Sequence, residues 1–232
     1  GVGVSADRVA TIPSGVDLSA FTPRPKDDAL AKEFSLPAGI PVVGIVANYG
    51  AWKGQGVLIE AAVELERRGI GAVYLFAGRD TQGNLLREKI AEAGLGQERV
   101  RLLGFRQDVP RVLSLLDVSV NASTAGEGLS GAIRESLAMG IPVAASDVGG
   151  NREIVREGVT GKLFAAGDSK ALADAIEILI KNPQVARRMA EEGQRDVRER
   201  FTVERMIQST SEYYRTLLAR RNGLMTNRQI VQ

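Results

Sequence analysis

Apolar runs and helical periods alternate along most of the chain. A continuous apolar run predicts a buried strand at Val42–Ala47. Further apolar or mixed stretches predict strands at Ala72–Gly78, Val100–Leu103, Asp117–Ser123, Pro142–Ala145 and Gly161–Phe164. Helical spacing with stops or caps predicts helices at Val57–Arg68, Asn84–Ala93, Val109–Leu116, Asp168–Ile180, Pro183–Arg200 and Val203–Arg220. Strands that alternate with helices predict an α/β fold, in which a doubly wound parallel sheet of about six strands has helices on both faces.

Composition narrows the class of protein but does not name a function. The 232 residues are 44% hydrophobic and 25% charged, which is ordinary for a globular domain. A net charge of +2 is too small to argue for a nucleic-acid partner. The chain has no cysteine and no histidine, which excludes a disulfide, a thiolate metal site and a Ser-His-Asp triad. We therefore expect chemistry carried by carboxylates, cations and backbone amides.

The stretch Gly126–Ser146 carries the most specific chemistry. Glu127 lies on a loop and Glu135 near the start of the following helix, for which Ser130 is a suitable N-cap. The first amides of that helix, from Ser130 to Ala132, favour an anion. Two carboxylates beside an anion site suit a ligand with both phosphates and hydroxyls, such as a nucleotide-sugar. The alternative is a chance pair of glutamates on a solvated surface.

Two other loops are expected at the same edge of the sheet. The loop Ala47–Gly54 follows the first strand and places Lys53 to meet a diphosphate as a point charge, unless it is an ordinary exposed lysine. Beyond the third strand, Phe105 and Arg106 are expected to border a nucleobase; the equal alternative is that Phe105 is core and Asp108 a helix cap.

Two more side chains receive structural interpretations. Trp52, the only tryptophan, is expected to pack on the first helix rather than line a cleft. Glu153 is expected in the first turn of a helix, where an acidic residue stabilises the helix.

Several segments, in this order, resemble the C-terminal half of a family-4 retaining glycosyltransferase. Such enzymes have the GT-B fold, in which two Rossmann-like domains face each other across a cleft. The matching segments are Ile12–Phe21, Trp52–Ala61, Val100–Ser123, Gly126–Ser146 and Gly149–Phe164. The resemblance extends from Arg8 to about Tyr214.

The chain departs from the family pattern at three positions. Leu129 stands for the usual Phe and Ser130 for the usual Gly in the E-x7-E signature. Asn48 stands where the family has an Arg that neutralises phosphate together with the Lys. Arg79 or Arg106 is expected to supply the missing charge.

The resemblance implies a domain plan and a reaction. Residues 1–24 would be the interdomain linker and lead-in, residues 25–201 the nucleotide-sugar donor-binding domain, and residues 202–232 a C-terminal helix and frayed tail. The reaction would transfer a sugar from a nucleotide diphosphate to an acceptor hydroxyl with retention, and without a metal or other cofactor. Lys53 and Glu127 are the expected catalytic residues, Lys53 for the diphosphate and Glu127 for the sugar hydroxyls, while Glu135 would hold the ribose. The expected donor-binding residues are Asn48, Gly50, Lys53, Phe105, Arg106, Glu127, Leu129, Ser130, Gly131 and Glu135.

The resemblance also implies partners and leaves alternatives open. The acceptor-binding N-terminal domain is not in this sequence, so the chain is expected to bind donor but to transfer sugar weakly or not at all. The implied role is cell-envelope polysaccharide biosynthesis in the cytoplasm, with a peripheral position at the inner membrane surface as a further option. Two other functions remain: a non-catalytic nucleotide-sugar-binding module, and a nucleotide-sugar 2-epimerase, which the absence of histidine disfavours. The donor base and sugar, the acceptor and the linkage stay open.

The last helix carries an unusually apolar set for a chain end, namely Met206, Tyr213, Tyr214, Leu217 and Leu218. Without a partner domain, part of this set is expected to lie exposed or to be covered by a second copy of the chain. The alternative is that the helix packs on its own domain.

Overall fold

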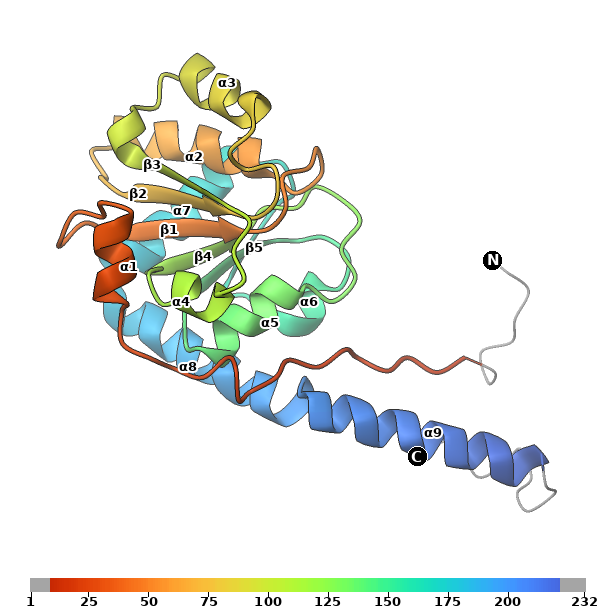
Figure 1. The fold of residues 1–232 in the computed structure, drawn as a ribbon. Helices are drawn as coiled ribbons and strands as arrows, with labels where there is room; N and C mark the ends of the chain where they lie inside the picture. Colours follow the sequence, from red (N-terminus) through yellow and green to blue (C-terminus); the bar gives the residue numbers. More distant parts are fainter. Residues whose placement is uncertain (1–8, 222–232) are drawn as a thin grey trace.

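Six parallel strands form one sheet in the computed structural model, which describes residues 9–221 (Figure 1). The order across the sheet is β3-β2-β1-β4-β5-β6. The strands are β1 Val42–Val46, β2 Val73–Ala77, β3 Val100–Gly104, β4 Val118–Asn121, β5 Val143–Ser146 and β6 Lys162–Phe164. This is the order of a Rossmann-type doubly wound sheet, so the predicted fold class is confirmed.

The helices confirm the predicted pattern with ends shifted by a few residues. They are α2 Gln55–Arg67, α3 Asn84–Glu92, α4 Val109–Leu113, α5 Gly131–Ala138, α6 Asn151–Ile154, α7 Ser169–Lys181, α8 Pro183–Arg200 and α9 Val203–Arg221. Asp168 caps α7 as expected, because its carboxylate accepts a hydrogen bond from the amide of Ala171. The apolar pattern did not predict α1 Asp28–Glu33 or the 3-10 turn Gln97–Arg99, since both are too short to show a helical period.

The helices cover both faces of the sheet (Figure 1). Side chains alternate along each strand, so Tyr74 and Phe76 of β2 join the core beneath α2, α3 and α7. Leu75 and Ala77 point the other way, into the core shared with α1 and α4. A third core unites α5, α6 and α8 with β5. Burial on both faces explains why β1, β2 and β5 have almost no polar residues, whereas the edge strands β3 and β6 carry Arg101 and Lys162 and are only partly buried.

The strand order reverses between β1 and β4, the two central neighbours. At their carboxyl ends begin the loop before α2, residues 47–54, and the loop before α5, residues 122–130, hereafter the signature loop. Open α/β sheets bind ligands at this reversal, because the two loops diverge and leave a crevice between them.

Glycines let the loops at this edge pack backbone against backbone. Gly54 (φ 74°) lies against the carbonyl of Ala122, and Gly149 (φ 50°) against the carbonyl of Glu127. A Cβ at either position would collide with those backbone atoms, which cannot swing away as a side chain would. The position of the Glu127 backbone therefore depends on Gly149.

The chain before the sheet and the last helix lie together. Residues 9–24, the described part of the lead-in, run beside α8 and α9 (Figure 1). The amide of Val16 donates to the carbonyl of Phe201 at 2.8 Å, and the amide of Val203 donates to Val16 at 3.2 Å. Within residues 9–221, no helix is both long and apolar enough to cross a membrane.

Beyond this junction α9 projects away from the domain (Figure 1), and much of its apolar set is exposed. Tyr214 is 61% exposed, Leu218 55% and the neighbouring Ile207 56%. The alternative that α9 packs on its own domain is therefore wrong for these side chains. Residues 1–8 and the tail from residue 222 lie outside the described residues.

We expect the exposed face of α9 to drive self-association, or its amides to exchange fast if the chain stays monomeric, because exposed apolar surface favours contact. Sedimentation velocity over a range of concentrations tests this, and Leu218→Glu should lower any association. The matched control is Ile178→Glu on α7, also exposed at 38%. A monomer with strongly protected amides through residues 203–221 would contradict the prediction.

We expect Gly149→Ala to displace the signature loop, because its Cβ meets the Glu127 carbonyl. Amide exchange of residues 126–131 should speed up, and the thermal midpoint should fall. Gly158→Ala is the control, since Gly158 has a similar positive φ of 71° but open space around it. Equal effects of the two substitutions would show that backbone strain alone is at work, not the contact with Glu127.

Candidate functional site

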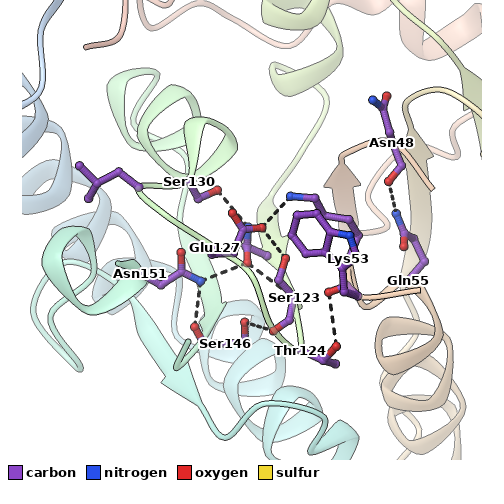
Figure 2. Close-up of polar contacts among 12 residues, drawn as sticks. Asn48, Lys53, Gln55, Ser123, Thr124, Glu127, Ser130, Ser146 and Asn151 are labelled. Atoms are coloured by element: carbon purple, nitrogen blue, oxygen red, sulfur yellow. Dashed lines mark hydrogen bonds and ion pairs between the residues drawn. The ribbon is translucent and has the colours of Figure 1, made fainter. Parts of the chain in front are cut away.

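An ion pair spans the crevice between the two central loops. The Glu127 carboxylate accepts hydrogen bonds from the Lys53 ammonium at 2.7 Å and from the Ser123 hydroxyl at 2.6 Å (Figure 2). The Glu127 side chain is 7% exposed and that of Lys53 is 24% exposed. The Lys53 ammonium also lies 3.9 Å from the centre of the Trp52 ring. The two residues predicted to be catalytic are thus in direct contact.

Opposing effects set the pKa of Glu127. Burial acts to raise this pKa, but the hydrogen bonds and charge from Lys53 and Ser123 outweigh it, so the pKa lies below its ordinary value. Glu127 is therefore a carboxylate at neutral pH. The ion pair makes this part of the site electrically neutral when no ligand is bound.

A buried polar network lies behind Glu127. The Asn121 amide donates to the Ser130 hydroxyl at 3.0 Å, and the Asn151 amide donates to the Asn121 oxygen at 3.2 Å and to the Ser146 carbonyl at 2.9 Å. Figure 2 shows Ser130, Ser146 and Asn151 converging from the signature loop, β5 and α6, and Asn121 is the last residue of β4. Sequence reasoning missed Asn121, Ser123 and Asn151. Their positions in the sequence could have indicated them. Asn121 and Ser123 are polar residues at and just beyond the end of β4, and Asn151 follows two glycines.

Ser130 occupies the N-cap position of α5, but its side chain does not cap the helix as expected. Its hydroxyl instead accepts from Asn121, which the end of β4 directs at it. The first amides of α5 are consequently not capped by Ser130. They face the crevice at the positive end of the helix, where an anion is stabilised.

The two loops border a cavity of about 380 Å³ at the strand reversal. Eight of the ten predicted donor-binding residues line it: Asn48, Lys53, Phe105, Arg106, Glu127, Leu129, Ser130 and Gly131. Gly50 does not line it; its carbonyl accepts from the Lys53 amide at 3.0 Å, so it shapes the turn that presents Lys53. Glu135 does not line it either, and its carboxylate lies beside Gly131.

Glu135 differs from Glu127 in its electrostatics. Burial raises the pKa of Glu135, and the neighbouring positive charge of Arg134 only partly opposes this. Glu135 is half-buried within α5, so it is not an ordinary solvated surface residue.

The missing family arginine leaves Asn48 with a different contact. The Asn48 side-chain oxygen accepts from the backbone amide of Arg79 at 2.9 Å, and its carbonyl accepts from Gln55 at 3.0 Å (Figure 2). Asn48 therefore joins the loops after β1 and β2 and contributes no charge. Of the two expected replacements, Arg106 is already paired with Asp108 at 2.6 Å. Arg79 is exposed, with its guanidinium 4.9 Å from the centre of the Phe105 ring.

The structure also decides between the alternatives for three other residues. Phe105 is 56% exposed, so the interpretation that it is core is wrong. Asp108 stands at the N-cap of α4, but its carboxylate binds Arg106 instead of a helix amide. Trp52 is 41% exposed beneath Lys53 and beside Gly126, so it is not buried on α2 as expected. Glu153 lies exposed in the first turn of α6, as the structural interpretation requires.

A larger cavity of about 550 Å³ lies at the opposite edge of the sheet, near the amino ends of β1, β4 and β5. Its lining includes an ion pair between Lys26 and Asp117 at 3.3 Å. This cavity lies at the amino ends of the strands, however, whereas open α/β sheets bind ligands at the carboxyl ends. We therefore assign the functional site to the smaller cavity.

Comparisons with known proteins agree with this geometry. The family model for glycosyl transferases group 1 matches residues 40–182. D-inositol 3-phosphate glycosyltransferase of Nocardia farcinica is 34% identical over 81% of this chain and 43% of its own length. HepE of Anabaena, solved in complex with UDP-glucose, is 30% identical with a TM-score of 0.84, over 92% of this chain and 59% of that one.

A further structure indicates which half of such enzymes is present. The C-terminal domain of a group 1 glycosyl transferase, LpcC of Francisella tularensis, is 25% identical with a TM-score of 0.69. That match covers 82% of this chain and all of the other, 100%. This chain spans about half the length of the curated relatives it matches. The family model, the relatives and the GT-B neighbours together show that the chain belongs to the group 1 glycosyltransferases.

Proposed function

We propose that this chain is the donor-binding half of a retaining, metal-independent hexosyltransferase. It holds a nucleoside-diphosphate sugar in the 380 Å³ cavity for transfer to an acceptor hydroxyl. The observation that carries the proposal is the Lys53–Glu127 pair beside the uncapped start of α5, at the point where the strand order reverses. By resemblance, we place the whole enzyme in cell-envelope polysaccharide biosynthesis in the cytoplasm.

The cavity matches the chemistry of such a donor. A diphosphate needs positive charge and N–H donors, which Lys53 and the amides of Gly131 and Ala132 supply. The sugar presents hydroxyl donors, for which the Glu127 carboxylate in the cavity wall is an acceptor. By resemblance, we assign the ribose hydroxyls to Glu135, which lies beside Gly131 at the start of α5. The exposed ring of Phe105, at the mouth of the cavity, suits the flat face of a base.

As the bond between the sugar and the diphosphate breaks, negative charge develops on the departing diphosphate and positive charge on the sugar ring. The acceptor oxygen forms the new bond to the sugar, and its proton leaves with the diphosphate. Lys53 and the α5 amides are fixed before the reaction and stabilise the first charge, and the Glu127 carboxylate stabilises the second. For this, the Lys53 ammonium must donate to the phosphate as well as to Glu127, and its three N–H donors allow both contacts. The proposal assigns the stabilisation of both charges to these groups and includes no metal.

Relatives of about twice this length point to a second half that would supply the acceptor site. We therefore propose that this chain alone binds donor and transfers sugar weakly or not at all. One observation favours a non-catalytic binding module instead: Asn48 brings no charge and Arg106 is neutralised by Asp108, so Lys53 carries more of the phosphate charge than in the family pattern.

Calorimetric titration tests the donor site, with the affinities for UDP, GDP and ADP each compared with the affinity for the corresponding nucleoside. Lys53→Met should weaken the diphosphate by about tenfold to a hundredfold, since a hydrogen bond to a charged group contributes roughly 1.5–3 kcal/mol. The nucleoside should bind as before, and Lys89→Met on the exposed face of α3 is the control. Unchanged diphosphate affinity in Lys53→Met, or no diphosphate binding by the wild type, would refute the proposal.

Glu135→Gln should separate function from stability. Because the pKa of Glu135 is raised in the folded state, its charge costs stability at neutral pH. The neutral amide should therefore raise the thermal midpoint at pH 7 while weakening the nucleoside diphosphate. The gain should shrink as the pH falls through the raised pKa of the folded state, and it should vanish below about 4.3, the ordinary glutamate value, because the wild type is then protonated in both states.

The exposed Glu153→Gln is the matched control and should change neither quantity. Loss of both stability and affinity in Glu135→Gln would show that Glu135 is structural, and unchanged affinity would remove it from the site.

A further inference from the structure

Arg134 is the one charged residue that is buried as a whole among residues 9–219, whose side chains the structure describes, with 5% of its surface exposed. It lies in α5 between the core residue Ile133 and Glu135. Burial lowers the pKa of its guanidinium from the ordinary value, and the charge of Glu135 opposes this. A buried charge of this kind is costly, and an apolar side chain of similar volume would avoid the cost. Stability alone does not explain an arginine here.

The hydrogen bonds of Arg134 go to backbone carbonyls from two separate segments. Its Nε donates to Ser130 at 3.3 Å, and one terminal nitrogen donates to Leu129 at 3.2 Å. The other terminal nitrogen donates to the carbonyl of Ser14 in the lead-in. The planar fork of a guanidinium can hold three acceptors in a fixed relation, which the single ammonium of lysine cannot.

The segments that Arg134 joins have different surroundings. Leu129 and Ser130 line the cavity and precede the first amides of α5. Ser14 is followed by Gly15 and Val16, and Val16 is hydrogen-bonded to the start of α9. Gly15 packs directly on the backbone of Thr202 and Val203, so a Cβ there would collide with both. The lead-in is thus held by two sets of contacts, one with the start of α9 and one with Arg134.

We propose that Arg134 is a positioning residue that transmits the position of the lead-in to the signature loop. This inference rests on the proposed function of the cavity, since the loop matters for donor binding only if the donor binds there. Displacement of the lead-in removes the Ser14 carbonyl, one of the three acceptors of Arg134. The guanidinium can then move, and its hydrogen bonds to Leu129 and Ser130 weaken. By linkage, a nucleotide that fixes the loop also fixes the lead-in. Movement of the segment that would connect to the second half therefore alters donor affinity.

Amide exchange of the full chain without ligand tests the link between the lead-in and the loop. Gly15→Ala displaces the lead-in without touching the cavity, and we expect about tenfold faster exchange at residues 128–132. Arg134→Met should give the same effect, and Arg134→Lys part of it. Gly71→Ala is the control, because a Cβ at Gly71 makes only ordinary contacts, with Arg99. The amides of β1 serve as a reference and should not change in any variant.

The double variant distinguishes coupling from general loosening. If Arg134 carries the signal, Gly15→Ala should add little in the Arg134→Met background, whereas independent effects should multiply. Faster exchange near Val16 and Val203 with no change at residues 128–132 would overturn the proposal, as would fully multiplicative effects. Should Arg134→Met fail to fold, Gly15→Ala in the wild type and in Arg134→Lys still decides.

Titration with UDP then connects the link to the donor. We expect Gly15→Ala to weaken UDP by at least about threefold, and Gly71→Ala to leave it unchanged. A coupled loop in a chain that binds no nucleoside diphosphate would overturn the proposed function but not the role of Arg134. Normal UDP affinity in Gly15→Ala with a loosened loop would overturn the claim that lead-in movement alters donor binding.

Discussion

The contact between Lys53 and Glu127 joins the two loops on which the candidate site depends. One loop follows β1 and the other follows β4, and these strands are neighbours only because the strand order reverses between them. The pair is at 2.7 Å and largely shielded from water, so each charge lowers the cost of burying the other. It holds a cation that can bind phosphate next to a carboxylate that can accept hydrogen bonds from hydroxyl groups. A ligand with both kinds of group can engage both, whereas a simple anion must compete with Glu127 for Lys53.

The rest of the site holds this pair in place from behind. Ser123 and the network of Asn121, Ser130 and Asn151 are buried polar groups, and such groups fix geometry because leaving one unpaired is costly. Gly149 lets the neighbouring backbone approach Glu127 closely. Arg134 of α5 donates hydrogen bonds to the carbonyls of Leu129 and Ser130, which precede this helix. The signature loop is thus held by polar contacts on several sides, which suits a site that must exist before its ligand arrives.

The sequence predicted the strands, the long helices and the pairing of loops well, because strands buried on both faces and amphipathic helices each impose a clear period. It also predicted Lys53 and Glu127 at one edge, since parallel strands end together. It could not predict that the Ser130 hydroxyl would accept a hydrogen bond from Asn121 instead of capping α5, because this depends on a contact between separate elements. For the same reason the sequence did not predict that the Asp108 carboxylate would accept from Arg106. The contacts of Arg134 could not be predicted either, because its acceptors are backbone carbonyls, which every residue has.

Nuclear magnetic resonance of the labelled chain, titrated with UDP, GDP and ADP, would locate the bound nucleotide. With at least one of them, the largest amide shifts should fall on Lys53, Gly131 and Ala132, and saturation should follow a single affinity. If the largest shifts instead fall around Ile40, Asp117 and Ile141, which line the cavity at the opposite edge, the assignment of the donor site to the strand reversal is wrong. No shifts with any of the three would contradict donor binding by this half of the enzyme.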